Sequence, residues 1–94
     1  TKGYLNGGKQ VAGTGTIDLD GNVGPIGGVE QKMIGASEKG AQYFLAPQDD
    51  CAEVLGHVPA GLEVFAVANL KDALKVLDTI AQGASLETLP TCGN

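Results

Sequence analysis

The sequence contains no arginine and no tryptophan. Its six basic residues are all lysines and stand against eleven Asp and Glu residues, so the formal net charge at pH 7 is -5. An acidic chain without guanidinium groups is poorly suited to bind the phosphate backbone of nucleic acids. Aromatic residues make up only 4% of the chain, too few for a platform on which unpaired bases could stack. We therefore expect no nucleic-acid partner.

Long hydrophobic runs are also missing. No apolar run approaches the roughly 18 residues that a membrane-spanning helix requires. Hydrophobic residues nevertheless make up 43% of the 94 residues, which is enough for a folded core. A chain of this length has room for one domain. We expect a single domain over residues 1–94, with residues 84–94 as its C-terminal tail.

Cysteine is scarce, and no CxxC motif is present. Cys51 and Cys92 are the two cysteines and His57 is the only histidine, so the ligands for a zinc site are missing. The cysteines are either two free thiols or one disulfide that ties the tail to the segment at Cys51. A cysteine in a tail without helical or strand-like pattern favours the disulfide. That disulfide would place the protein outside the reducing cytosol.

The spacing of hydrophobic residues changes along the chain from a period near two to helical spacing. Residues 1–8 are predicted to be a loop, 10–18 a strand, 18–22 an Asp-Gly hairpin turn, and Val23 a short return strand. The elements predicted after this hairpin are a helix over 29–39, a strand over 43–46, a short helix over 50–55, a strand over 62–67, and a helix between Asn69 and Gly83. This order indicates an α/β fold in two layers, a hairpin followed by helices alternating with mainly parallel strands.

Each of the two longer predicted helices has an apolar face. In the first helix the face is formed by Val29, Met33, Ile34 and Ala36. In the last helix it is formed by Leu70, Ala73, Leu74, Leu77 and Ile80. We expect both faces to pack against the sheet.

Several motifs that bind cofactors or metals are only partly matched. The glycine-rich segments at residues 13–15 and 24–28 do not have the GxGxxG spacing of a nucleotide-binding loop between a strand and a helix. The turn at Asp18 is a poor calcium loop, because position 12 counted from Asp18 is Val29 instead of a glutamate. His57 has no serine or cysteine suitably placed beside it to suggest a catalytic triad. We expect neither a cofactor nor a bound metal.

Lys32 follows Gly27 and Gly28 in the first turn or so of its predicted helix. The positive end of the helix dipole lies there and disfavours a charged ammonium group. If the side chain points inward, desolvation adds to this effect, and a neutral lysine amine is a competent general base for a serine hydroxyl. The alternative is an exposed lysine paired with Glu30 or Glu38.

Residues 14–32 read TGTIDLDGNVGPIGGVEQK. The stretch begins with Thr-Gly, places Ile, Leu, Gly and Val at alternate positions, and continues with Pro-Ile-Gly-Gly and a lysine four residues later. This pattern resembles the segment around the catalytic lysine of Lon-type serine proteases, and the similarity extends over about residues 9–80. The variable positions are more similar to the PDZ-containing, ATPase-free relatives of bacterial envelopes. The resemblance implies the C-terminal half of a Lon proteolytic-domain fold.

The resemblance implies roles for four residues. Lys32 matches the lysine of a Ser–Lys dyad, the base that activates the serine for peptide-bond hydrolysis. Thr14 matches a threonine whose hydroxyl orients that lysine amine, and Gly27 and Gly28 match the turn that sets the start of the lysine helix. The implied enzyme is a serine endopeptidase that acts on polypeptide substrates.

The family's serine lies further before the lysine than this chain extends, and Ser37 and Ser85 match nothing in the family pattern. We therefore expect the catalytic serine upstream of this chain and expect the 94 residues alone to be inactive. The expected partners are the missing N-terminal half of the proteolytic domain, a PDZ domain upstream of it, and further copies of the chain in a homo-oligomer. The resemblance also implies an extracytoplasmic protein, anchored to the membrane through a segment absent from this chain.

A second function is compatible with the same residues. A non-catalytic interaction domain could have kept the Lon fold and lost the chemistry. The residue at the upstream serine position discriminates between the two, because Ala or Gly there would favour the interaction domain.

Overall fold

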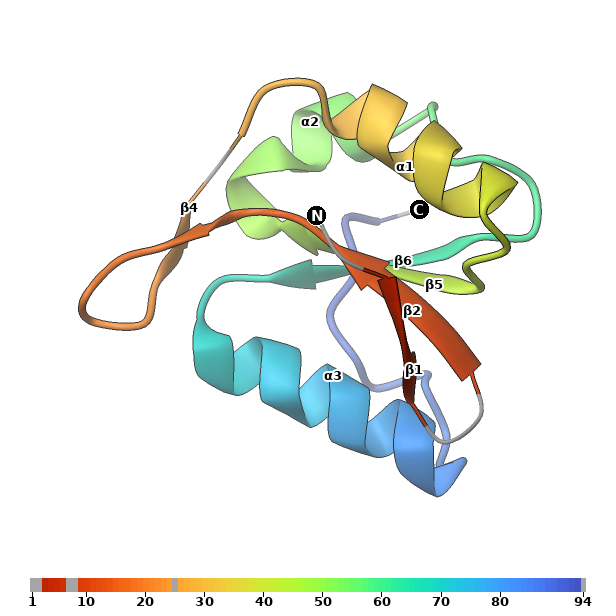
Figure 1. Ribbon diagram of the computed structural model, residues 1–94. Helices are drawn as coiled ribbons and strands as arrows, with labels where there is room; N and C mark the ends of the chain where they lie inside the picture. The colour runs from red at the N-terminus through yellow and green to blue at the C-terminus, as the bar shows by residue number, and fades with distance from the viewer. Residues whose placement is uncertain (1–2, 7–8, 25, 94) are drawn as a thin grey trace.

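A four-stranded sheet forms the centre of the protein (Figure 1). The computed structural model describes residues 3–6, 9–24 and 26–93. The strand order is β1-β2-β5-β6, in which β1 (Gly3–Asn6) pairs antiparallel with β2 (Lys9–Gly13). β2 runs parallel to β5 (Tyr43–Pro47), and β5 runs parallel to β6 (Glu63–Val67). The predicted α/β class with mainly parallel strands is confirmed.

Helices cover both faces of this sheet (Figure 1). One face carries α1 (Val29–Glu38), the 3-10 turn η1 (Gln48–Asp50) and α2 (Cys51–Val54), whereas α3 (Leu70–Gln82) covers the other. The protein therefore has three layers instead of the predicted two. Right-handed crossovers between successive parallel strands place α1 and α2 on the same face, but α3 follows the last strand and packs on the face still uncovered. Within the described residues, no helix has both the length and the apolar character needed to cross a bilayer.

Each face of the sheet packs its own hydrophobic core. The core under α1 and α2 contains Ala12, Val29, Met33, Ala36, Ala41, Phe44, Ala46, Val54, Leu62 and Val64. The core under α3 contains Val11, Leu45, Phe65, Val67, Val76, Ile80 and Leu89. Neighbouring strand residues alternate between the two cores because successive side chains of a strand point to opposite faces.

A second hairpin, formed by β3 (Thr16–Ile17) and β4 (Val23–Gly24), projects from the sheet (Figure 1). The Asp18 carboxylate closes its turn, because one oxygen accepts hydrogen bonds from the amides of Asp20 and Asn22, both at 2.9 Å. The hydrogen bond from the Asn22 amide is the largest cause that lowers the pKa of Asp18 from its ordinary value of 3.8. The predicted hairpin turn is confirmed.

The single strand predicted over residues 10–18 is wrong, because the chain leaves the sheet between β2 and β3. β2 ends at Gly13, and Gly15 has a φ of 145°. A Cβ atom at Gly15 would lie 2.9 Å from Cγ1 of Val23, closer than real Cβ atoms approach other atoms. Only glycine allows the backbone to bend here toward β4, and this bend separates the projecting hairpin from the sheet.

The loop predicted over residues 1–8 is wrong for residues 3–6, which form β1. The register pairs Asn6 with Lys9. The remaining residues of that predicted loop lie outside the described part of the chain. Asn-Gly is the strongest short-range signal for a hairpin, so the Asn6-Gly7 pair was the sequence signal for this strand.

The apolar faces predicted for the two longer helices are partly wrong. In α1, Val29, Met33 and Ala36 are buried as expected, but Ile34 is 42% exposed. In α3, the buried residues are Val76 and Ile80, while Leu70 and Leu74 are exposed. Val76 and Ile80 are four residues apart, about 400° of helical rotation, and so share a face, but Leu74 lies about 120° from Ile80 around the helix. The spacing of apolar residues in the sequence predicted the two helices correctly. It did not predict which of these apolar residues pack against the sheet.

The C-terminal tail runs along the edge of the sheet at β6. Leu89 is buried in the core under α3, and the Pro90 carbonyl accepts a hydrogen bond from the Ala66 amide of β6 at 2.9 Å. Cys92 then forms the predicted disulfide with Cys51 of α2 and packs against the core on the other face. The tail therefore crosses from one face to the other, behind the sheet in Figure 1.

We expect the carboxyl group of Asp18 to titrate below pH 3.8, because the folded turn stabilises its charged form. Above the unfolded pKa, the charged carboxylate should stabilise the hairpin turn fully. This stabilisation should be lost as the pH falls through the lower pKa of the folded state. Carbon-13 NMR of the Asp18 carboxyl measures the titration directly. A Gly21→Ala variant, strained at a φ of 84°, should move the pKa back toward 3.8. A wild-type titration at or above 3.8 would contradict the turn geometry.

Replacing both Cys51 and Cys92 by serine is expected to lower the free energy of unfolding by about 3–4 kcal/mol. The reason is that the disulfide spans a sequence separation of 41 and restricts the unfolded chain. Urea denaturation measures the loss, and the Ala66 amide should exchange faster with solvent once its partner segment is untethered. Reductant should destabilise the wild type to the same extent and leave the double-serine variant unchanged. Equal stability of the oxidised wild type and the variant would contradict this role of the disulfide.

Candidate functional site

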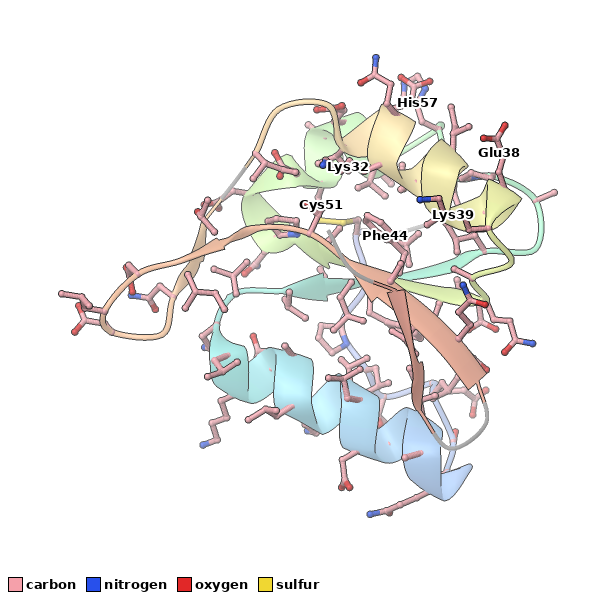
Figure 2. All side chains as sticks on the ribbon, in the orientation of Figure 1. Lys32, Glu38, Lys39, Phe44, Cys51 and His57 are labelled. Atoms are coloured by element: carbon pink, nitrogen blue, oxygen red, sulfur yellow. A yellow bond between two sulfur atoms is a disulfide. The ribbon has the colours of Figure 1, made fainter. Side chains whose placement is uncertain are left out.

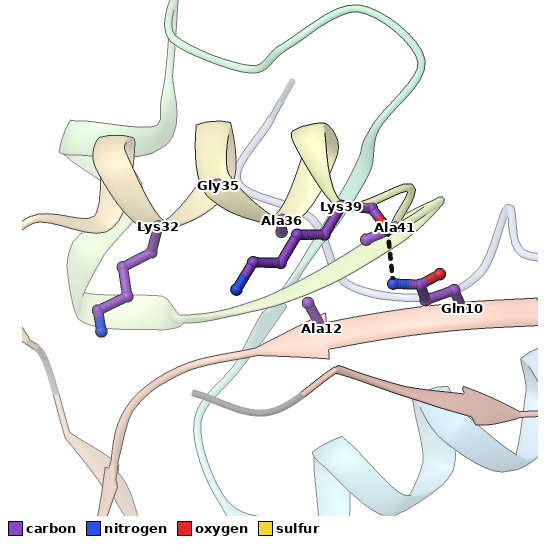
Figure 3. Close-up of a pocket in the computed structure, with 7 residues that line it drawn as sticks. All are labelled: Gln10, Ala12, Lys32, Gly35, Ala36, Lys39 and Ala41. Carbon is purple, nitrogen blue, oxygen red and sulfur yellow. Dashed lines mark hydrogen bonds between the residues drawn. The ribbon is translucent and has the colours of Figure 1, made fainter.

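A cleft lies between α1 and β2 (Figure 3), with a volume of about 260 Å³. It is lined by Gln10, Ala12, Lys32, Gly35, Ala36, Lys39 and Ala41. Two of these side chains are cationic and none is acidic. The part of the chain that the structure describes has no group of three or more His, Cys, Asp or Glu side chains that could hold a metal ion. The chemistry available in the cleft is therefore that of lysine amines and a carboxamide.

Two carboxylates from the neighbouring crossover hold the start of α1. The buried Asp50 accepts a hydrogen bond from the Ile26 amide at 2.9 Å, and Glu53 accepts one from the Glu30 amide at 3.0 Å. The Glu30 amide lies in the first turn of α1, where amides have no partner inside the helix and negative charge is favoured, whereas Ile26 lies two residues before the N-cap. Gly28 occupies the N-cap with a φ of 75°, a conformation that glycine adopts without strain. These contacts determine where α1 begins.

Lys32 is the fourth residue of α1, and its amide donates a hydrogen bond to the Gly28 carbonyl at 3.1 Å. Its side chain is exposed and points from α1 toward the sheet side, at one end of the cleft (Figure 3). The sequence suggested two causes that would favour a neutral amine, the helix dipole and burial of the side chain. The described residues do not bury the Lys32 side chain, so the second cause is not observed. The alternative ion pair with Glu30 is not formed either, because the Glu30 carboxylate lies 3.2 Å from Nδ1 of His57. Glu38 lies on the outer side of α1 (Figure 2).

Thr14 lies beyond the end of β2 and does not line the cleft. Its amide continues the sheet ladder by donating to the Leu45 carbonyl at 3.2 Å. Alternation along the strand places Thr14 on the same face as Ala12, which lines the cleft. The structure thus puts Thr14 and Lys32 on one face of the sheet, with Gly28 directly at the start of the lysine helix.

The two serines of this chain are not placed to be partners of Lys32. Ser37 is five residues further along α1, and helical residues at that separation point about 140° apart. Ser85 follows α3, on the opposite face of the sheet, and its hydroxyl lies 3.5 Å from the Glu87 carboxylate. Within this chain, the amine of Lys32 therefore has no serine hydroxyl to deprotonate.

Sequence reasoning missed Lys39 and Gln10 as cleft residues. The Gln10 side-chain amide donates a hydrogen bond to the Lys39 carbonyl at 3.1 Å (Figure 3). A signal for Lys39 was present, because it follows Lys32 by seven residues and two helical turns return a side chain to nearly the same face. Asp50 and Glu53 had no comparable signal, because their partners are distant in sequence.

Comparisons with known proteins find similarity over most of the chain. The model of the Lon protease (S16) C-terminal proteolytic domain matches residues 5–79. A Lon protease of Azospirillum brasilense is 43% identical over 70 residues, which cover 71% of this chain and 9% of that protein. A Lon protease of Rickettsia felis is 37% identical and Lon protease 1 of Borreliella burgdorferi is 31% identical, each over 70 residues with the same coverage. The chain spans about 9% of the length of these relatives.

Gly28→Ala is expected to lower the free energy of unfolding by about 1–2 kcal/mol, because a residue with a Cβ is strained in the left-handed region. The new Cβ would lie 3.0 Å from Oε1 of Gln31, the mobile end of a side chain, so backbone strain dominates the loss. Gly27→Ala is the matched control, since a Cβ there meets nothing within 4 Å. Its stability should change by less than about 0.5 kcal/mol in the same urea denaturation. Equal losses in both variants would contradict the requirement for glycine at the N-cap.

Proposed function

Because the chain belongs to the Lon protease family, we propose that it is the lysine-bearing part of a serine endopeptidase, with Lys32 as the general base. The observation that carries this proposal is the position of the amine. Lys32 projects from the first turns of a helix at the end of a cleft, and its amine forms no ion pair with a carboxylate among the described residues. No carboxylate among the described residues therefore holds this group in its charged form, and in the neutral form a lysine amine can accept a proton.

The proposed mechanism is acyl transfer through a serine. The Lys32 amine accepts the serine hydroxyl proton as the serine oxygen forms a bond to the peptide carbonyl carbon. The resulting ammonium returns this proton to the leaving amine as the peptide C–N bond breaks. A water molecule then attacks the acyl ester and passes its proton to the same amine, which returns it to the serine oxygen. At the end of the cycle the Lys32 amine is again in the neutral form in which it began.

The nucleophile of this mechanism is proposed to be a serine outside these 94 residues, and the chain alone is proposed to be inactive. The positions of Ser37 and Ser85 support this, because neither hydroxyl faces the amine of Lys32. Thr14 is proposed as a positioning residue for the amine. Its place on the face of the sheet that carries Lys32 supports that role.

We also propose that the protein functions in an oxidising, extracytoplasmic compartment on polypeptide substrates. The Cys51–Cys92 disulfide supports this location, because single structural disulfides persist where the glutathione and thioredoxin systems do not reduce them. The tail that it fastens is part of the core on both faces of the sheet.

Lys32→Ala and Lys32→Arg are both expected to reduce hydrolysis of labelled casein by the full-length gene product roughly 10²–10⁴-fold. Alanine removes the base, whereas arginine keeps the positive charge and cannot act as a neutral amine at ordinary pH. Urea denaturation of each variant should match the wild type, because the Lys32 side chain is exposed and packs in no core.

Lys75→Ala is the matched control, because Lys75 is an exposed lysine on α3 at the opposite face, and its hydrolysis rate should equal that of the wild type. Activity retained in Lys32→Arg would overturn the general-base role and leave only a charge role. A wild-type protein that hydrolyses no polypeptide would overturn the proposed enzyme, and Ala or Gly at the upstream serine position would then establish the interaction domain.

A further inference from the structure

The charge in the cleft is opposite to the charge of the chain. The sequence carries a formal charge of -5, yet Lys32 and Lys39 line the cleft and no Asp or Glu does. The ion pair found among the described residues joins His57 to Glu30 and involves neither lysine. Glu38, next to Lys39 in sequence, lies on the outer side of α1 (Figure 2). Among the described residues, neither lysine side chain that faces the cleft is paired with a carboxylate.

The backbone at Lys39 is held firmly, and its side chain runs along the cleft. Its amide bonds to the Gly35 and Ala36 carbonyls at 3.2 Å, as the C-cap of α1, and its carbonyl accepts from the Gln10 side chain at 3.1 Å. Figure 3 shows the Lys39 side chain extending back beneath α1 in the direction of Lys32, above Ala12. The two lysines are seven residues apart, which corresponds to about 10.5 Å along the helix axis.

The two lysines occupy different positions on α1. Lys32 extends from the N-terminal part of the helix, whereas Lys39 has its backbone at the C-cap and its side chain back along the cleft. The two side chains therefore reach different parts of the same cleft, and Lys39 lies beside the proposed general base. The cleft is small, with a volume of about 260 Å³. Such a space takes one long side chain and not a folded partner.

We propose that Lys39 is a specificity-determining residue that selects an acidic side chain, Glu or Asp, in the polypeptide bound beside Lys32. The inference rests on the proposed function for the identity of the ligand as a polypeptide. A substrate carboxylate between α1 and β2 would form a charge-assisted hydrogen bond with the Lys39 ammonium. Ala12, Gly35 and Ala36 contribute no side chain that competes for that ammonium. A neutral or basic side chain in the same place would leave the ammonium group unpaired.

Peptide pairs that differ at a single position test the selection. Acetyl-Ala-Glu-Ala-amide and acetyl-Ala-Gln-Ala-amide have the same shape and differ by one charge. NMR titration of the 94-residue chain should show the glutamyl peptide shifting the Ala12 and Ala36 methyl signals with a Kd roughly threefold to tenfold lower than that of the glutaminyl peptide. Raising the ionic strength should reduce this ratio, because the cleft is open to solvent.

Charge reversal with a matched control separates the cleft from the overall charge. Lys39→Glu should abolish the preference for the glutamyl peptide and create one for acetyl-Ala-Lys-Ala-amide. Lys75→Glu changes the net charge of the chain by the same amount on the opposite face, and it should keep the wild-type ratio. Lys39→Arg should also keep it, since the positive charge remains. In the full-length gene product, kcat/KM for a longer peptide series should follow the same order.

The outcomes distinguish failure of this inference from failure of the proposed function. Equal Kd values for the glutamyl and glutaminyl peptides, or the same change in Lys39→Glu and Lys75→Glu, would overturn the role of Lys39 even if the full-length protein hydrolyses peptides. Selective binding that depends on Lys39, without any hydrolysis by the full-length protein, would uphold the acidic subsite and overturn the enzyme. If the Lys39→Glu variant hydrolyses peptides with the same side-chain preference as the wild type, the acidic subsite alone would be overturned.

Discussion

The beginning of α1 is the constraint on which the functional geometry depends. Lys32 lies one turn after Gly28, so any shift of the helix start along its axis would move the amine relative to β2. The left-handed backbone at Gly28 and the carboxylates of Asp50 and Glu53 all act on the residues at this point. A hydrogen bond from an amide to a charged group contributes about 1.5–3 kcal/mol, enough to select one start over its neighbours.

Packing and capping determine different coordinates of the same helix. Val29 and Met33 are fully buried, and burial of side chains of this size contributes roughly 1.5–3 kcal/mol each. That burial sets the distance and rotation of α1 against the sheet, but an apolar contact is not directional. The caps are directional and set the position along the axis. The buried residues of α1 therefore determine how the helix is rotated against the sheet. Asp50 and Glu53 determine its position along its own axis, and both effects shape the cleft.

Local signals in the sequence predicted most of the fold, and the distant contacts could not be predicted. The turn at Asp18, the helix after Asn69 with its side-chain cap, and the bond between Cys51 and Cys92 follow from short patterns or from the isolation of the tail. The position of Lys32 was predicted from its resemblance to a family motif. The roles of Asp50 and Gln10 were not predictable, because each depends on a partner more than twenty residues away that no local rule identifies.

The C-terminal tail along β6 also affects whether strands of other molecules can pair with this edge of the sheet. An unoccupied outer strand offers a row of amides and carbonyls to any extended polypeptide, including an unfolded copy of the same protein. Here Pro90 supplies an acceptor to Ala66 but, as a proline, carries no amide hydrogen to offer onward. The fastened segment ends the ladder on that side without prolonging it. This segment therefore makes pairing of β6 with a strand of another chain less favourable.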